Sequence, residues 1–242
     1  MGPLRGAGGV GGGDRPCSQA AVHRSHLGVW RPTLQAMEHH DPVSEPAPAP
    51  ADPDFVVRLS GLRAEPAVDG AAPTAEHLAL ILETAVTVPD HGDLEPWRFA
   101  VCTGAGRDRF AQALVDGLHV RGGADLPGAV VAKMRSKAYQ APCAVMVIAS
   151  PDTSSNVQVW EQVVSASCTG YALVLAATGL GYGAVWKSAN VLDTEPVRAL
   201  FGAGPDETLL GWVNLGTPGP IGRKKLSALL EPPRPRVLLI DA

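Results

Sequence analysis

A polar loop in the middle of the sequence carries the residue types that most often do chemistry. The segment VPDHGDLEPWRFAV, residues 88–101, holds Asp90, His91, Asp93 and Glu95 within six positions. Carboxylates and an imidazole can bind a metal ion, act as acid and base, or line a loop shaped around a ligand. The residue types alone leave these three interpretations open.

A metal-dependent hydrolase is one interpretation of this loop. Asp90, His91 and Asp93 could supply ligands, because closely spaced loop residues can bind hard cations. A further imidazole or thiolate, which a zinc site usually needs, is missing nearby. The metal-dependent hydrolase therefore stays as the weaker alternative. A serine hydrolase is not favoured, because the sequence contains no G-x-S-x-G motif.

Two glycine-rich segments resemble dinucleotide-binding motifs but lack the required context. TGAGRDRF (103–110) has Arg109 where the third glycine is needed. GLGYGA (179–184) follows a helix pattern and precedes a strand pattern, which is the reverse of the order in a Rossmann fold. The glycines of the second segment are instead expected to end a helix and to allow a close backbone approach.

The composition of the whole chain indicates a soluble globular protein. Its 242 residues carry a net charge of −4, and 45% of them are hydrophobic. This balance predicts neither nucleic-acid nor membrane binding, and no apolar segment is long enough to span a bilayer. Cys102, Cys143 and Cys168 lie in apolar segments, which is typical of buried, reduced thiols. Since the N-terminal residues also lack a signal-peptide pattern, we expect a cytoplasmic protein.

The first part of the chain differs from the rest. Glycine dominates the first 13 positions, and PVSEPAPAPADP (42–53) is rich in proline. Such a segment buries too little apolar area to offset its ordering entropy. We therefore predict a disordered arm over residues 1–53 and one folded domain over residues 54–242.

Hydrophobic periodicity predicts alternating helices and strands along this domain. Helices are expected at 55–59, 75–85 (capped by Thr74), 107–118, 128–138, 160–178 and 195–201. Strands are expected at 98–102, 143–149, 183–188, 209–216 and 236–240. The helix at 160–178 is the longest and most apolar, so we expect it to be buried at the centre and followed by Gly179 as its stop. This order of elements indicates an α+β fold.

Four segments occur in a characteristic order along the domain. They are RLSGLR (58–63), VPDHGDLEPWRF (88–99), GLGYGAVWKS (179–188) and NLGTP (214–218). In this order and spacing they resemble the FMN-dependent nitroreductase family, in particular its small single-domain bacterial branch with a PDH…PWRF loop. The resemblance implies a three-layer α+β fold with a central mixed or antiparallel sheet and flanking helices. It also implies a homodimer with FMN at the subunit interface.

The resemblance implies the activity of an FMN-dependent NAD(P)H oxidoreductase. In a ping-pong reaction, NAD(P)H delivers hydride to the flavin and leaves, and a nitro compound, quinone or similar acceptor then takes the electrons. Because the cofactor performs the hydride transfer, no catalytic side chain is predicted. A flavin-binding or flavin-sequestering protein without turnover is the alternative, because two cations common in the family are missing.

The resemblance also assigns residues to the cofactor. Arg58 and Ser60 match positions of an R-R-S stretch that binds FMN, and Leu59 stands where the second arginine is usual. Thr87 stands at another position that is often arginine. His91 matches a loop residue that reaches FMN, and we expect it to do so from the partner subunit.

A strand end and a basic run complete the predicted site. Trp186, Lys187 and Ser188 match the segment that lines the isoalloxazine ring, where backbone N–H groups can bind flavin N5 and O4. Ordinary core packing is the alternative for Trp186. GRKK (222–225) could restore the lost positive charge, or could be a solvated surface run. Arg98 is expected to face a carboxylate.

Overall fold

The computed structural model describes residues 51–61, 68–218, 236 and 240. The chain divides into two units, Met1–Val43 and Ser44–Ala242, and every described residue belongs to the second unit. The predicted arm of residues 1–53 lies almost wholly outside the described residues, as do the GRKK run and most of the strand expected at 236–240. The predictions for these segments therefore stay predictions.

An antiparallel sheet of five strands forms the middle layer of the fold. β3 (Cys143–Ala149) pairs with β2 (Trp97–Thr103) on one side and with β5 (Thr208–Pro218) on the other. β4 (Gly183–Lys187) and the two-residue β1 (Val68–Asp69) both pair with β5. The four predicted strands within the described residues are confirmed, and β5 pairs with three of the other strands.

One face of the sheet is covered by α2 (Ala75–Ala85) and α5 (Val159–Gly179). The hydroxyl of Thr74 caps α2 as predicted, because it accepts a backbone N–H from the first turn. Ile81 of α2 and Leu173 of α5 are fully buried in one apolar cluster with Cys143, Val145 and Val147 of β3. Burial of this cluster fixes both helices against the sheet.

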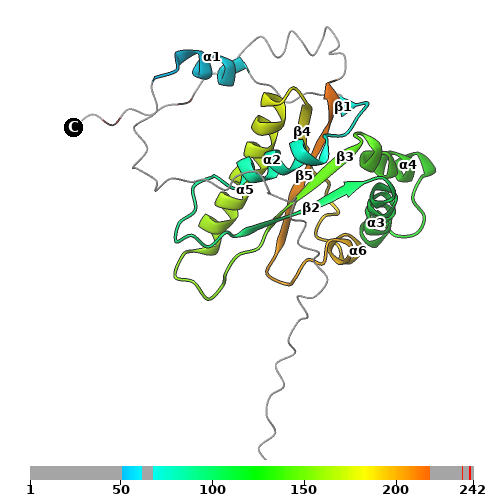
Figure 1. Cartoon of the computed structure of the whole chain (residues 1–242). Coiled ribbons are helices and arrows are strands. Elements are labelled where there is room, and N and C mark those ends of the chain that lie inside the picture. Colours follow the sequence, from blue (N-terminus) through cyan, green and yellow to red (C-terminus); the bar gives the residue numbers. More distant parts are fainter. Residues whose placement is uncertain (1–50, 62–67, 219–235, 237–239, 241–242) are drawn as a thin grey trace, which may run out of the picture. The chain divides into compact units, whose positions relative to one another are not determined.

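The other face of the sheet carries α3 (Ala105–Gly122), α4 (Gly128–Ser136) and α6 (Glu195–Leu200). Phe110 of α3 packs edge-to-face on Trp212 of β5, with ring centroids 5.2 Å apart. Figure 1 shows these helices on one side of the strands and α2 with α5 on the other. The predicted three-layer α+β fold is confirmed, because helices cover both faces of the sheet and β3 is buried along its whole length.

The surface of α5 differs from the prediction. The helix is not buried on all sides. Its exposed stripe, spaced by three and four residues, consists of Trp160, Val164, Cys168 and Tyr171. The prediction of a buried Cys168 is wrong because that residue lies on the stripe, whereas Cys102 and Cys143 are buried as expected.

The helix α5 ends at Gly179, one residue later than predicted, and the glycine that turns the chain lies two residues after the predicted stop. Gly179 is still helical, and Gly181 takes the positive φ of 82° that turns the chain. The N–H of Tyr182 then donates to the carbonyl of Ala177 at 2.9 Å, which closes the turn. The glycine that stops the helix is therefore Gly181.

A short helix, α1 (Pro53–Gly61), precedes the sheet and confirms the predicted helix at 55–59. Asp52 begins it by accepting the N–H of Phe55 at 2.9 Å. Phe55, Val56 and Val57 are exposed. Among the described residues, no helix combines the length and hydrophobicity needed to cross a membrane.

Candidate functional site

The polar loop between α2 and β2 is turned tightly and held by its own side chains. Asp90 accepts the N–H of Glu95 at 2.6 Å. Asp93 and Glu95 both take positive φ values, 50° and 46°, which are uncommon for residues other than glycine. Asp90 therefore braces the loop through a hydrogen bond to its backbone.

His91 projects from this loop and pairs with the first turn of α5. Its Nδ1 lies 3.1 Å from Oε2 of Glu161, and 72% of the His91 side chain is exposed. Within the residues that the structure describes, no three His, Cys, Asp or Glu side chains cluster to hold a metal ion. The arrangement therefore gives no support to the metal-dependent hydrolase.

Arg98, at the end of the loop, is held by a carboxylate as expected. Its Nε donates to Oε1 of Glu207 at 2.6 Å and its Nη2 to Oε2 at 2.5 Å. It also donates to the carbonyls of Phe201 and Gly202. Burial raises the pKa of Glu207, but hydrogen bonds from Arg98 and from the Gly204 N–H outweigh it and lower the pKa to about 2. The pair anchors β2 to the segment before β5.

Trp186 on β4 occupies a slot made by two glycines. A Cβ on Gly170 of α5 would lie 2.6 Å from the Trp186 ring, and one on Gly211 of β5 would lie 2.7 Å from the indole nitrogen. The indole thus packs between the helix and the sheet. This placement favours the packing role for the side chain and leaves the backbone at the end of β4 as the part that could face a cofactor.

The end of β4 contacts a cation that the sequence did not single out. Lys187 is partly buried and pairs in register with Trp212. The carbonyl of Ser188 accepts from Nζ of Lys137 at 3.4 Å. Lys137 begins a short 3₁₀ helix, η1 (Lys137–Tyr139). Its only sequence signal is a basic residue near the end of a predicted helix, which does not mark a functional site.

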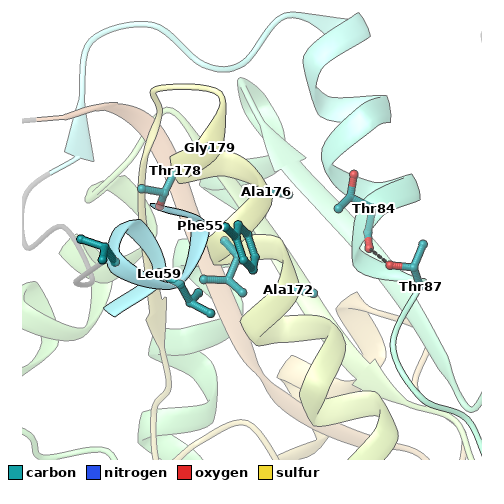
Figure 2. Close-up of a pocket in the computed structure, with 10 residues that line it drawn as sticks. Phe55, Leu59, Thr84, Thr87, Ala172, Ala176, Thr178 and Gly179 are labelled. Carbon is teal, nitrogen blue, oxygen red and sulfur yellow. Dashed lines mark hydrogen bonds between the residues drawn. The ribbon is translucent and has the colours of Figure 1, made fainter. Parts of the chain in front are cut away.

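A cavity of about 880 Å³ lies between α1, the end of α2 and the C-terminal half of α5. Its lining consists of Phe55, Val57, Leu59, Thr84, Thr87, Ala172, Leu175, Ala176, Thr178 and Gly179. Figure 2 shows Phe55 and Leu59 of α1 beside α5, and Thr84 and Thr87 at the end of α2. The lining is mostly apolar, with hydroxyls as its side-chain polar groups.

The three hydroxyls of the cavity donate to backbone carbonyls three or four residues earlier in the chain. Thr84 donates to the carbonyl of Leu80 at 2.7 Å, and Thr87 donates to that of Thr84 at 2.9 Å. Thr178 donates to the carbonyl of Val174 at 2.7 Å. Since each hydroxyl has one proton, these groups present lone pairs to a ligand.

The structure brings some of the predicted cofactor residues together. Leu59 of α1 and Thr87, which follows the end of α2, both line the cavity. His91 lies instead beside the first turn of α5. The side chains of Arg58 and Ser60 fall outside the described part of α1, so their contacts stay predictions.

A comparison with known protein families decides the classification of this fold. Residues 67–217, well over half of the chain, match the sequence model of the nitroreductase family. The chain belongs to the nitroreductase family. This confirms the family indicated by the four sequence segments.

Individual relatives agree with this nitroreductase classification. The Escherichia coli K12 protein named "Putative NAD(P)H nitroreductase YdjA" is 35% identical over 147 residues, covering 61% of this chain and 79% of the relative. A Haemophilus influenzae protein named "Putative NAD(P)H nitroreductase" is 32% identical over 165 residues, covering 68% of this chain and 88% of the relative.

Solved structures share the nitroreductase fold. The FMN-dependent nitroreductase NfnB from Mycobacterium smegmatis, in complex with NADPH, aligns with a TM-score of 0.55 and 20% identity, covering 76% of this chain and 96% of its own. A nitroreductase-like family protein from Bacillus cereus aligns with a TM-score of 0.55 and 18% identity, covering 77% of this chain and 98% of its own. At these identities the likeness supports the fold.

Proposed function

We propose that this chain is an FMN-dependent NAD(P)H oxidoreductase that passes electrons to a nitro compound, a quinone or a similar acceptor. The family match over residues 67–217 carries the proposal. The names of the two bacterial relatives and the bound NADPH of the Mycobacterium smegmatis structure support it. When bound, FMN supplies the hydride-transfer chemistry, and the protein supplies binding and orientation.

The described residues fit part of an FMN molecule. The apolar cavity suits a flat ring, and the backbone of Lys187 and Ser188 ends a strand where N–H groups could meet it. His91 is accessible on its loop. The family resemblance assigns the phosphate to Arg58 and Ser60 of α1. These residues would bind and orient the cofactor.

A second copy of the chain would cover the exposed stripe of α5. Trp160 is 66% exposed, Val164 54% and Tyr171 56%. Exposed large apolar side chains that gather on one helix face favour a protein interface. A two-fold dimer would place this face against the same face of the partner. Glu161, the partner of His91, follows Trp160, so this dimer would bring His91 close to the other subunit.

The colour of the purified protein tests the proposal. We expect a yellow protein with flavin absorption that bleaches anaerobically when NADH or NADPH is added. Colourless protein that cannot be reconstituted with FMN would overturn it. Flavin that binds but stays oxidised would favour the flavin-sequestering alternative. That alternative is based on the uncharged residues Leu59 and Thr87, which stand where arginine is common in the family.

A further inference from the structure

A lysine from η1 holds the peptide group that follows the end of β4. β4 pairs with β5 as far as Lys187, which lies opposite Trp212, and Ser188 is the first residue beyond this pairing. The carbonyl of Ser188 accepts a hydrogen bond from Nζ of Lys137 at 3.4 Å, across 51 positions of sequence. The chain that leaves the strand is therefore held by a side chain from another element of the fold.

η1 presents this lysine from a braced position. Ala138, the residue after Lys137, is 2% exposed and belongs to the apolar cluster on the α3 side of the sheet. The hydroxyl of Tyr139 donates to Oδ1 of Asp108, in the first turn of α3, at 2.8 Å. Because both following residues are anchored, the backbone of Lys137 has a fixed position relative to the sheet.

The contact between Lys137 and Ser188 is better suited to orienting one peptide group than to stabilising the fold. Lys137 is partly buried and Ser188 is exposed. Ordering a lysine side chain costs conformational entropy, and a hydrogen bond to a carbonyl that water can also reach returns little net stability. An ammonium group beside a carbonyl also polarises the peptide group, which strengthens its N–H as a donor.

A second lysine lies on the same side of this strand end. The indole of Trp186 packs against Gly170 of α5, and neighbouring residues of a strand point to opposite faces of a sheet. Lys187 therefore points to the face that carries α3 and η1, the element of Lys137. A hydride carries two electrons and one proton, so a flavin ring that accepts one gains a negative charge. Ammonium groups nearby stabilise that charge.

We propose that Lys137 is a positioning residue of the flavin site, which holds the peptide group at the end of β4 and favours the reduced over the oxidised flavin. The inference rests on the proposed function, which gives the backbone of Lys187 and Ser188 to the flavin ring. Lys137 acts through Ser188, so no direct contact with the flavin is required. Its effect should therefore depend on a side chain that keeps both the charge and the donor.

The reduction potential of the flavin bound to the full-length protein tests the proposal. We expect Lys137→Met to weaken the binding of reduced flavin relative to oxidised flavin by about tenfold, which lowers the two-electron potential by about 30 mV. Lys137→Arg keeps the charge and the donor and should retain the wild-type potential. Lys133→Met is the matched control, because Lys133 is an exposed lysine of α4 four positions earlier. A wild-type potential in Lys137→Met, or an equal shift in Lys133→Met, would overturn the inference.

Hydrogen exchange in the apoprotein gives a measurement that does not need the flavin. Backbone amides of residues 186–190 should exchange faster in Lys137→Met than in the wild type, because the strand end loses its support. Lys133→Met should exchange like the wild type. Equal exchange in all three proteins would show that Lys137 does not hold the strand end, and the inference would fail.

The outcomes separate this inference from the proposed function. A folded wild-type protein that binds no flavin would overturn the proposed function and, with it, the assignment of Lys137 to a flavin site. Flavin that binds and is reduced at the same potential in the wild type and in Lys137→Met would overturn only the role of Lys137. A lowered potential in Lys137→Met that Lys137→Arg restores would support both.

Discussion

Arg98 and Glu207 form a bidentate ion pair that joins β2, the strand after the polar loop, to the segment leading into β5. Their side chains are 27% and 14% exposed. A two-point contact of this kind, partly shielded from water, is stronger than a single exposed pair. The end of the loop that carries His91 is therefore tied to the sheet by charge as well as by backbone pairing.

This pair should make the folded chain sensitive to acid. The pKa of Glu207 falls from an ordinary 4.5 to about 2 on folding, where burial is outweighed by the hydrogen bonds to the carboxylate. The stabilisation that the ionised Glu207 gives to the folded state is complete above pH 4.5. It is lost as the pH falls towards 2, because the unfolded state takes up the proton first. Urea unfolding at a series of pH values measures this loss.

Glu207→Gln should remove the same part of the pH dependence. We expect the variant to be less stable than the wild type at pH 7 by about 2 kcal/mol, because a charge-assisted contact is lost. Asp206→Asn is the matched control, since Asp206 is an exposed neighbour, and it should keep the wild-type acid profile. An unchanged acid profile in Glu207→Gln would contradict the role of the pair.

The contact between Gly170 and Trp186 predicts a strong effect of one methyl group. Gly170→Ala should lower the free energy of unfolding by about 1–3 kcal/mol, because its Cβ would overlap the Trp186 ring. Gly179→Ala, at the end of the same helix, meets no atom within 4 Å and should be neutral or slightly stabilising. Denaturant unfolding of both variants checks this. Equal stability of the two would mean that the ring moves aside freely.

Substitution of His91 should affect cofactor binding but not the stability of the fold. We expect His91→Ala to change the free energy of unfolding by less than about 1 kcal/mol, because its pair with Glu161 is exposed. The same change should weaken FMN binding by about tenfold if His91 contacts the flavin. Thermal unfolding and flavin titration measure the two quantities. Glu161→Gln is the control, and an equal loss of affinity there would assign the effect to loop positioning.

The exposed stripe of α5 should control self-association. Val164→Glu is expected to convert a dimer to a monomer, because it would bury a charge at the interface. Val130→Glu, at an exposed apolar position of α4, should leave the dimer intact. Sedimentation velocity over a range of concentrations distinguishes the two. A Val164→Glu protein that remains dimeric would place the interface elsewhere.

Thiol labelling gives a second view of that interface. Burial raises the pKa of Cys102 to about 11 and of Cys143 to about 12, so neither should react near pH 8. Cys168 is exposed on the stripe. In a Cys17→Ser background, we expect Cys168 to be labelled readily in the Val164→Glu monomer and slowly in the dimer. Equal labelling rates would argue against burial of the stripe.

Local patterns in the sequence were sufficient for most of the fold. The apolar runs of β2 and β3 and the cap at Thr74 depend on near neighbours in the chain, and all are confirmed. The exact glycine that ends α5 was missed, because two candidates lie two residues apart and helix boundaries shift easily.

Long-range contacts could not be predicted in the same way. The sequence indicated that Arg98 needs a carboxylate, but Glu207 lies 109 positions away and no local pattern marks it. The contact of Lys137 with the Ser188 carbonyl is equally non-local. The exposed face of α5 was misjudged because hydrophobicity alone does not reveal whether the chain itself or another molecule covers a helix. The family resemblance assigned Leu59 and Thr87 to the cofactor, but no pattern in the sequence indicated that they line one cavity.

The position of β5 has a consequence for how the chain is made. β5 holds together β1, β3 and β4, yet among the described strands it is the last to leave the ribosome. Until it emerges, β1 and β4 lack the strand with which they pair, and one edge of β3 stays open. Open strand edges favour misassembly during synthesis. Completion of the sheet must therefore wait for the final described strand, and sequence-distant pairing of this kind makes folding slow.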